Sequence, residues 1–243
     1  MIVASIHQPH YLIWLGLLDK IAKSDVFVVL DDVQYNKRSF QHRTLYSTDA
    51  GAKYLSLSVN SKGAQSGSVY IKDITLPNQQ MLPTHFKTLL GRYGKCPGWF
   101  LVGDELARIY NKKWKYLIDI NLELLQLTLE LYSLKPRILM SSSLETTEVK
   151  GALMYELSGM ADCDCYLSGV GAKEYMDSVP AEKRLCRVEF QDFTHPSYRQ
   201  STKAEFQAGS LALEWAIEEP ETFKDDFKNL ALPTQAYRCL HDQ

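Results

Sequence analysis

Two histidines that directly follow an apolar run are the first residues of the chain that could do chemistry. Ile2–Ile6 leads into His7-Gln8-Pro9-His10-Tyr11. A His-x-x-His loop between a strand and a helix can hold the phosphates of a nucleotide, through imidazole hydrogen bonds and the helix N-terminus. Such a loop would stabilise the charge that grows on a phosphoryl group during adenylyl or cytidylyl transfer. The alternative is that His7 only hydrogen-bonds the backbone of its own loop.

A second polar group follows the apolar run Val26–Leu30. Asp31 and Asp32 could bind magnesium, orient a substrate amine or act as a base. Adjacent side chains at a strand end point to opposite faces, so one of the two is expected to serve the site. Two alternatives stay open: the carboxylates of Asp31 and Asp32 cap the loop, and the basic side chains that follow them in the sequence are simply exposed to solvent. A clamp for phosphate or carboxylate is expected from three basic residues, Lys37, Arg38 and Arg43.

Three further polar groups follow predicted strands in the second half of the chain. They are Ser141-Ser142-Ser143, Ser168-Gly169-Val170-Gly171 and His195-Pro196-Ser197-Tyr198-Arg199-Gln200. The glycines of the middle group would let backbone amides approach an anion, although an ordinary tight turn explains them equally well. Ser142 and His195 suggest a hydrolase triad, but the chain lacks the Gly-x-Ser-x-Gly nucleophile elbow.

The elements that must position these residues alternate between strand and helix. Strands are predicted at 2–6, 26–30, 53–59, 138–141, 163–167 and 188–193, and helices at 15–23, 82–93, 104–132, 149–160, 173–176 and 211–230. The pattern over 104–132 fits either one long helix or two helices joined near Asp119–Asn121, and Pro220 is expected to break the last helix. The Ser/Gly-rich stretch 61–68 between 53–59 and an extended 69–76 predicts a hairpin or a flap.

This order predicts an α/β fold with a mostly parallel central sheet and flanking helices. We expect a Rossmann-like three-layer sandwich that resembles the fold of nucleotidyltransferases. In such sheets, ligands bind beyond the carboxyl ends of the strands. We expect one domain over residues 1–243, with a helical insertion at about 80–132 and a helical tail at about 209–230. The sequence leaves open whether the helix at 104–132 lies in the core or forms a homodimer surface.

The composition is that of an ordinary globular protein, with 243 residues, 45% of them hydrophobic and 23% charged. A net charge of −2 argues against a nucleic-acid binder. Five cysteines without a Cys-x-x-Cys pair argue against a disulfide framework and a structural zinc site. Without a basic signal-peptide region or a run of about 20 apolar residues, the expectation is a cytoplasmic protein with no integral membrane segment.

Several of these motifs together resemble the WbqC-like protein family. The resemblance spans most of residues 1–205, and His10 and Ile13 stand where the family usually has Asn and Pro. The residues that carry it are Ile6–Gly16, Asp19–Ala22, Asp25–Tyr35, Lys37–Arg43, Tyr166–Ala172, Tyr175 and His195–Gln200.

The resemblance implies a role in bacterial surface-polysaccharide (O-antigen, lipopolysaccharide) biosynthesis. Members of the family often belong to gene clusters of that pathway, and a glycine transferase role that decorates an amino sugar is suggested for some. The expected function is therefore transfer of a glycyl or aminoacyl group to an amino sugar, with a nucleotide sugar or amino acid as small-molecule substrate. ATP or another nucleotide with Mg²⁺ would activate the carboxyl group. The alternatives are a nucleotidyltransferase acting on a sugar phosphate, and a non-catalytic protein that binds sugar nucleotides or organises assembly.

On this hypothesis the candidate site residues fall into two sets, and none is assigned to a metal. The residues expected to take part in catalysis are His7, Asp31, Asp32, Lys37 and Arg38. The residues expected to bind substrate or nucleotide are Gln8, His10, Tyr11, Gln34, Arg43, Ser142, Ser168, Gly169, Gly171, Tyr175, His195, Tyr198 and Gln200.

Overall fold

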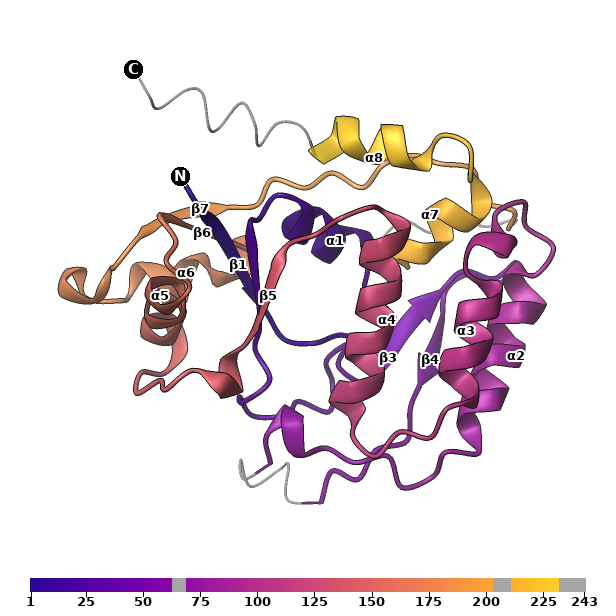
Figure 1. Cartoon of the computed structure of the whole chain (residues 1–243), viewed down its shortest axis with the longest axis horizontal. Helices are drawn as coiled ribbons and strands as arrows, with labels where there is room; N and C mark the ends of the chain where they lie inside the picture. The colour runs from indigo at the N-terminus through magenta and orange to yellow at the C-terminus, as the bar shows by residue number, and fades with distance from the viewer. Residues whose placement is uncertain (63–68, 203–210, 232–243) are drawn as a thin grey trace.

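A five-stranded parallel sheet forms the centre of the computed structural model, which describes residues 1–62, 69–202 and 211–231 (Figure 1). The order across the sheet is β5-β2-β1-β6-β7, and every neighbouring pair is parallel. The predicted α/β fold with a mostly parallel sheet is therefore confirmed. The strands are β1 (Val3–His7), β2 (Val26–Val29), β5 (Arg137–Met140), β6 (Cys165–Ser168) and β7 (Arg187–Phe190).

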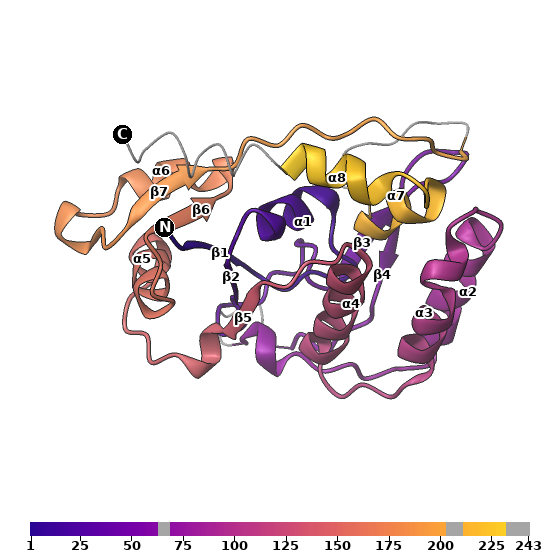
Figure 2. The ribbon, with the colours of Figure 1, turned by 45° about the horizontal axis from the view of Figure 1, so that its top comes forward.

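Helices cover both faces of this sheet. Because successive strand residues point to opposite faces, Phe27 and Val29 pack in the same hydrophobic core as helix α1 (Leu15–Ala22). Val26 and Val28 instead pack in the core that contains α5 (Lys150–Met160). In Figure 2, α1 and α8 (Phe223–Ala231) lie on one side of the sheet, and α5 and α6 (Lys173–Asp177) on the other. Covered on both faces, β2 is buried throughout, which explains its unbroken apolar sequence.

The chain between β2 and β5 carries a hairpin followed by three helices. The helices lie within the segment where the helical insertion is expected. Of the two alternatives for 104–132, the structure has two helices, with the junction at residues 112–116 and not near Asp119–Asn121. Lys112 separates them because its backbone is extended (φ −76°, ψ 150°). The elements are β3 (Arg43–Tyr46), β4 (Lys53–Ser56), α2 (Met81–Tyr93), α3 (Gly103–Asn111) and α4 (Leu117–Leu131).

The strand predicted at 53–59 pairs with a segment for which no strand was predicted. Its first part, β4, pairs antiparallel with β3, with Arg43 opposite Ser56. In the segment 69–76, which we expected to be extended, Ile71–Asp73 is a turn of 3₁₀ helix and Thr75 forms isolated bridges with Asn60 and Tyr116. Alternation of side chains identifies a half-buried strand but not the strand it pairs with. Residues 63–68 of the Ser/Gly-rich stretch lie outside the described chain.

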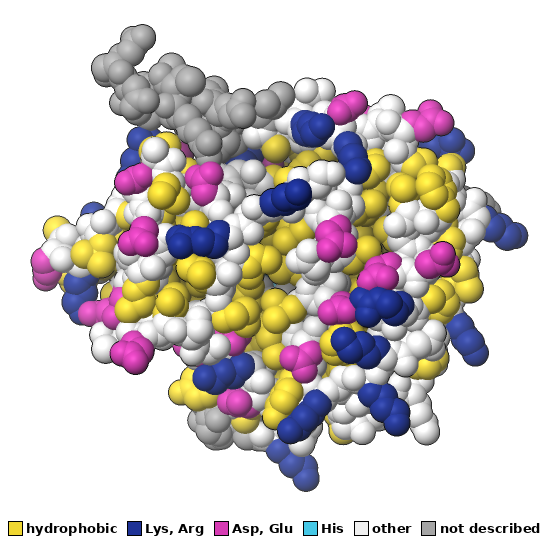
Figure 3. Space-filling view, viewed as in Figure 1, with side chains coloured by type: hydrophobic (Ala, Val, Ile, Leu, Met, Phe, Trp, Pro, Cys, Tyr) yellow, Lys and Arg dark blue, Asp and Glu magenta, His cyan; other side chains and the backbone are white. Residues whose placement is uncertain are grey.

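The C-terminal tail is a pair of helices, α7 (Ala212–Glu218) and α8, which flank the predicted break at Pro220. Residues 209–210 of the expected tail lie outside the described ranges. On the face drawn in Figure 3, basic and acidic side chains are interspersed, with apolar side chains visible between them. Within the described ranges, no helix combines the length and the apolar character needed to cross a bilayer.

The strand order reverses at β1, and this reversal determines where a ligand site is expected. From β1 the chain proceeds to β2 and β5 on one side, whereas β6 and β7 lie on the other side of β1. The connections that leave β1 and β6 therefore diverge at the carboxyl ends of these two strands. In open parallel sheets, a crevice at such a position is the usual place for ligand binding.

Candidate functional site

A cavity of about 600 Å³ opens at this reversal of strand order. Its polar lining comes from the end of β1 (His7 and Gln8), from α1 (Lys20), from the end of β6 (Ser168) and from the segment that follows β7. The last of these supplies Gln191 and Asp192. The rest of the wall is mostly apolar or glycine: Ile6, Trp14, Gly16, Leu17, Leu30, Met154, Tyr166, Gly169, Val170, Gly171, Ala172, Tyr175 and Phe193. Of the predicted site residues, the cavity thus collects His7, Gln8, Ser168, Gly169, Gly171 and Tyr175.

His7 is held in one tautomer at the cavity wall. Its Nδ1 lies 2.9 Å from the carbonyl oxygen of Gln8. A carbonyl oxygen can only accept, so Nδ1 carries the hydrogen and Nε2 of the neutral ring keeps its lone pair. Burial lowers the pKa of His7 well below its usual value, and the nearby charges of Lys20 and His10 lower it further. One ring nitrogen therefore binds the loop backbone, while the other is a neutral acceptor at physiological pH.

His10 supports the ring of His7 and does not line the cavity itself. The rings of His7 and His10 meet edge to face with centroids 4.6 Å apart, and the ring of Phe40 packs against that of His10 with centroids 5.8 Å apart. Burial, with a further contribution from Lys20, lowers the pKa of His10 to about 4. The structure therefore makes His10 a packing partner of His7.

Gln8 is oriented by a buried glutamine on a neighbouring loop. The side-chain amide of Gln41 donates to Oε1 of Gln8 at 2.8 Å, and its own Oε1 accepts the backbone N–H of Asn36 at 3.1 Å. Asn121 of α4 fixes the loop by donating to the carbonyl oxygen of Gln41 at 2.8 Å. Because Oε1 of Gln8 already accepts a hydrogen bond, the NH₂ group of Gln8 remains available to donate to a ligand.

Lys20 is the cavity residue that the sequence analysis missed. It is 4% exposed, and its Nζ donates to the carbonyl oxygen of Ile6 at 3.1 Å. Burial lowers its pKa to about 8. The sequence did contain a signal for Lys20. It lies three residues after Leu17 and next to Ile21, on the face of the helix where an apolar residue is expected, so a lysine there indicates a special role.

The loop after β6 forms a wall with unfilled space beside its glycines. Gly169 has an ordinary extended backbone (φ −76°, ψ 148°). A Cβ atom built at either Gly169 or Gly171 would meet nothing within 4 Å. Backbone conformation therefore does not require glycine at 169, and packing requires it at neither position. The open space beside Gly169 and Gly171 is consistent with room for a ligand.

Asp31 and Ser142 bind each other away from the cavity. The Asp31 carboxylate accepts hydrogen bonds from Ser141 Oγ (3.1 Å), Ser142 N–H (2.9 Å) and Ser142 Oγ (2.7 Å). Asp32 accepts a further bond from Ser141 Oγ. These contacts join the ends of β2 and β5. The structure therefore supports loop capping, the alternative left open for the two carboxylates, instead of a role at the cavity.

The predicted basic clamp also lies outside the cavity wall. Gln34, Lys37 and Arg38 are exposed on the loop after β2. Arg43 stacks on the ring of Tyr54 at 4.5 Å and donates to the carbonyl oxygen of Arg38 at 2.5 Å. The guanidinium of Arg43 thus stabilises the loop and the hairpin.

The remaining predicted residues lie in other parts of the molecule. Tyr11 is fully buried, and its hydroxyl bonds Tyr110 Oη at 2.5 Å and His85 Nδ1 at 2.8 Å. His195 donates from Nδ1 to the carbonyl oxygen of Pro196 at 2.8 Å. His195, Tyr198 and Gln200 follow β7 beyond the segment that lines the cavity.

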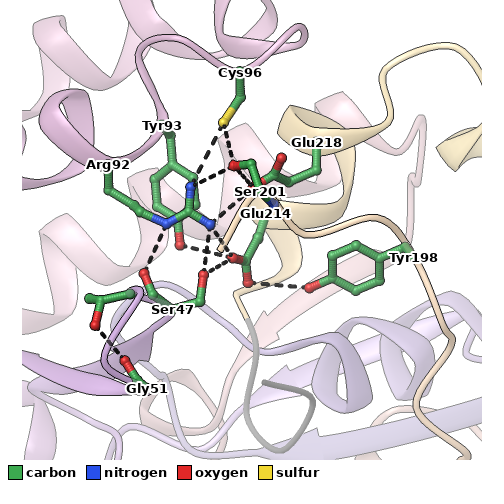
Figure 4. Close-up of polar contacts among 10 residues, drawn as sticks. Ser47, Gly51, Arg92, Tyr93, Cys96, Tyr198, Ser201, Glu214 and Glu218 are labelled. Atoms are coloured by element: carbon green, nitrogen blue, oxygen red, sulfur yellow. Dashed lines mark hydrogen bonds and ion pairs between the residues drawn. The ribbon is translucent and has the colours of Figure 1, made fainter. Parts of the chain in front are cut away.

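Tyr198 belongs to a buried ionic cluster that attaches α7 to α2 (Figure 4). Its hydroxyl donates to Glu214 at 3.2 Å. The guanidinium of Arg92 lies 3.3 Å from the carboxylate of Glu214 and 3.0 Å from that of Glu218, and it also donates to Ser47. Burial raises the pKa of Glu214, and the hydroxyls and Arg92 oppose that rise. The contacts assign this cluster a structural role.

Among the residues that the structure describes, no group of three or more His, Cys, Asp or Glu side chains is arranged to hold a metal ion. The described cavity lining includes one carboxylate, Asp192, which is exposed. The polar groups that line the cavity are a neutral imidazole, a lysine, side-chain amides, hydroxyls and this exposed carboxylate.

Comparisons with known proteins agree with the motifs at the cavity. The model of the WbqC-like protein family matches residues 8–212. The uncharacterized protein Rv1507c of Mycobacterium tuberculosis is 26% identical over 198 residues, which cover 81% of this chain and 85% of that protein. No solved structure matches the chain significantly. With the family match covering most of its length, the chain belongs to the WbqC-like protein family.

Proposed function

We propose that this protein is a transferase of bacterial surface-polysaccharide biosynthesis, and that it passes a glycyl or other aminoacyl group to the amine of a sugar. The reaction would take place in the cavity at the carboxyl ends of β1 and β6. The observation that carries the proposal is His7, which lines a cavity at the reversal of strand order and whose Nε2 keeps its lone pair. Membership of the WbqC-like family supports an amino sugar as the acceptor, as the resemblance implies.

The proposed step needs one general base and a means to hold the activated carboxyl group. The sugar amine attacks the carbonyl carbon of an acyl-adenylate or a similar activated acid, so that a C–N bond forms and the bond to the leaving group breaks. His7 Nε2 accepts the proton that the amine loses. The amide NH₂ of Gln8 is a neutral donor on the wall that can bind the carbonyl oxygen as charge develops on it. The hydroxyl of Ser168, also on the wall, donates to Tyr166 Oη at 3.3 Å.

The experiment is a product assay by mass spectrometry. The protein is incubated with glycine, ATP, Mg²⁺ and UDP- or dTDP-linked amino sugars, and the sugar nucleotide is examined for a mass gain of one glycyl group. We expect product with the wild type and a loss of about 100-fold or more with His7→Ala, the usual range for a general base. The matched control is His42→Ala, because His42 bonds Tyr35 Oη on another loop and does not line the cavity.

Three other outcomes would count against aminoacyl transfer or against the role of His7 in it. Pyrophosphate released from a sugar phosphate and a nucleotide, without any need for glycine, would identify the nucleotidyltransferase alternative. Binding of sugar nucleotides without any turnover would identify a binding or assembly protein. Equal product with wild type and His7→Ala would remove His7 from the reaction.

A further inference from the structure

Lys20 is a buried cation for which the described chain supplies no counter-charge. Its side chain lies on the inner face of α1, and none of the ion pairs among the described residues involves it. Of the three donors of its ammonium group, one is used by the carbonyl oxygen of Ile6. Removing an ammonium group from water without a paired anion is costly, so such a residue points to a ligand that completes it.

The surroundings of Lys20 leave room for that ligand. Lys20 lines the same cavity as Ser168, Gly169 and Gly171, where the space beside both glycines is open. Apart from Asp192, the other polar groups on the wall, His7 and Gln8 among them, are neutral. Asp192 is exposed and forms no ion pair with Lys20. The positive charge thus lies at the buried side of the cavity.

We propose that the cavity takes a ligand with an anionic oxygen group, a carboxylate or a phosphate, and buries that group against the ammonium of Lys20. This inference rests on the proposed function in that the cavity is taken as the substrate site. Within that function, the anion is the carboxylate of the amino acid or a phosphate of the nucleotide. Coulombic attraction across a few ångströms is strong in such a water-poor site.

Anion binding at Lys20 would also change the basicity of His7. The charge of Lys20 is one of the causes that lower the pKa of His7. An anion beside the ammonium would offset that charge, so the pKa of His7 would rise when the ligand is in place. The base would then be strongest in the complex, where the proposed transfer needs it.

Few of the groups that face Lys20 change protonation between about pH 6 and pH 9. Burial lowers the pKa of His10 to about 4 and that of His7 well below its usual value. Burial raises the pKa of Tyr166 and Tyr175, the two tyrosines on the cavity wall. Asp192 is the remaining charged group of the lining. With the pKa of Lys20 near 8, the part of the pH dependence in this range that Lys20→Met removes reports on Lys20.

The test is isothermal titration calorimetry with three probes: inorganic phosphate, glycine and ATP. Measurements at about pH 7 and pH 9 compare the wild type with Lys20→Met and with Lys173→Met, which removes an exposed lysine at the start of α6. We expect the wild type to bind at least one probe, with a Kd that rises about tenfold per pH unit above pH 8. Lys20→Met should weaken binding at least tenfold and remove the pH dependence, and Lys173→Met should do neither.

The probes distinguish the source of the anion, and two results would overturn the inference. Binding of glycine alone assigns Lys20 to a carboxylate, and binding of phosphate and ATP assigns it to a phosphate. Unchanged binding by Lys20→Met, or no saturable binding of any probe by the wild type, contradicts the inference. Calorimetry needs no turnover, so Lys20-dependent binding without glycyl transfer would reject the proposed function alone.

Discussion

Replacing Lys20 by methionine should stabilise the free protein, which is the opposite of what most substitutions of a buried residue do. Methionine has a similar length and volume but no charge. In the free protein, Lys20 is 4% exposed and has no ion-pair partner among the described residues. A residue kept for a ligand in spite of its cost to folding should show this combination of higher stability and lost binding.

The magnitude follows from the pKa of Lys20. Its value falls from 10.5 to about 8 on folding, and each pKa unit corresponds to about 1.4 kcal/mol. At pH 7, below both values, burial of the charged form costs about 3 kcal/mol. Loss of the hydrogen bond to the Ile6 carbonyl would offset about 1 kcal/mol of this gain. The net expectation at pH 7 is an increase of about 2 kcal/mol in the free energy of unfolding.

The sign of the pH dependence gives the prediction an internal check. The unfolded chain holds the Lys20 proton up to about pH 10.5, whereas the folded chain loses it above about pH 8. Between these values the unfolded state binds more protons, so the wild type gains stability relative to the variant as pH rises. The charge cost falls to about 1 kcal/mol near pH 9.5.

Thermal unfolding and urea titration of both proteins without ligand measure this difference. At pH 7 the variant should melt roughly 4–8 °C above the wild type, given about 2–4 °C per kcal/mol for a chain of this size. The difference should shrink or reverse near pH 9.5. Lys173→Met should show no such change. A variant that melts below the wild type at pH 7, or a difference that is the same at both pH values, would refute the reasoning.

Three further substitutions test other parts of the structure. Gly169→Val should leave the free energy of unfolding within about 0.5 kcal/mol of the wild type in urea titration, because the backbone is ordinary and the space is open; a larger loss would show that glycine is needed for the fold. Asp31→Ala should lower that free energy by about 1–3 kcal/mol, because three hydrogen bonds from Ser141 and Ser142 to the buried carboxylate are lost, and a variant as stable as the wild type would contradict the capping role. Arg92→Leu should cost about 3–5 kcal/mol at pH 7, since it leaves two carboxylates buried without their cation. Because burial already raises the pKa of Glu214, protonation should relieve this cost near pH 5, and a cost independent of pH would count against that explanation.

The strands and helices were predictable because burial on both faces leaves a simple signature. The apolar runs that became β1, β2 and β6 identify a parallel sheet, and the rule on carboxyl ends then selects the loops that follow them. This reasoning found His7 and the Ser168–Gly171 loop, both of which line the cavity. It did not give the partner of β4, because alternation carries no information on pairing.

Residues that depend on distant contacts were not predictable in this way. Asp31 follows β2 as a site residue would, but its partner Ser142 is 111 positions away and becomes a neighbour only when β5 pairs with β2. Lys20 reaches the cavity from inside a helix, so its role depends on how α1 packs against the sheet. In both cases three-dimensional packing decides which polar groups meet, and the one-dimensional pattern does not contain it.

Ligand-induced stabilisation is the most direct test of the claim that the cavity at β1 and β6 is the substrate site. Thermal shifts would be recorded with ATP, CTP, UDP- and dTDP-sugars, glycine and coenzyme A, each with and without Mg²⁺, on the wild type and on Gly169→Val. A ligand present at about 100 times its Kd adds about 2.7 kcal/mol to the stability of the protein. We predict that at least one of these compounds raises the melting temperature of the wild type and that Gly169→Val reduces or abolishes this shift. An equal shift in both proteins, or no shift with any compound, would contradict the claim.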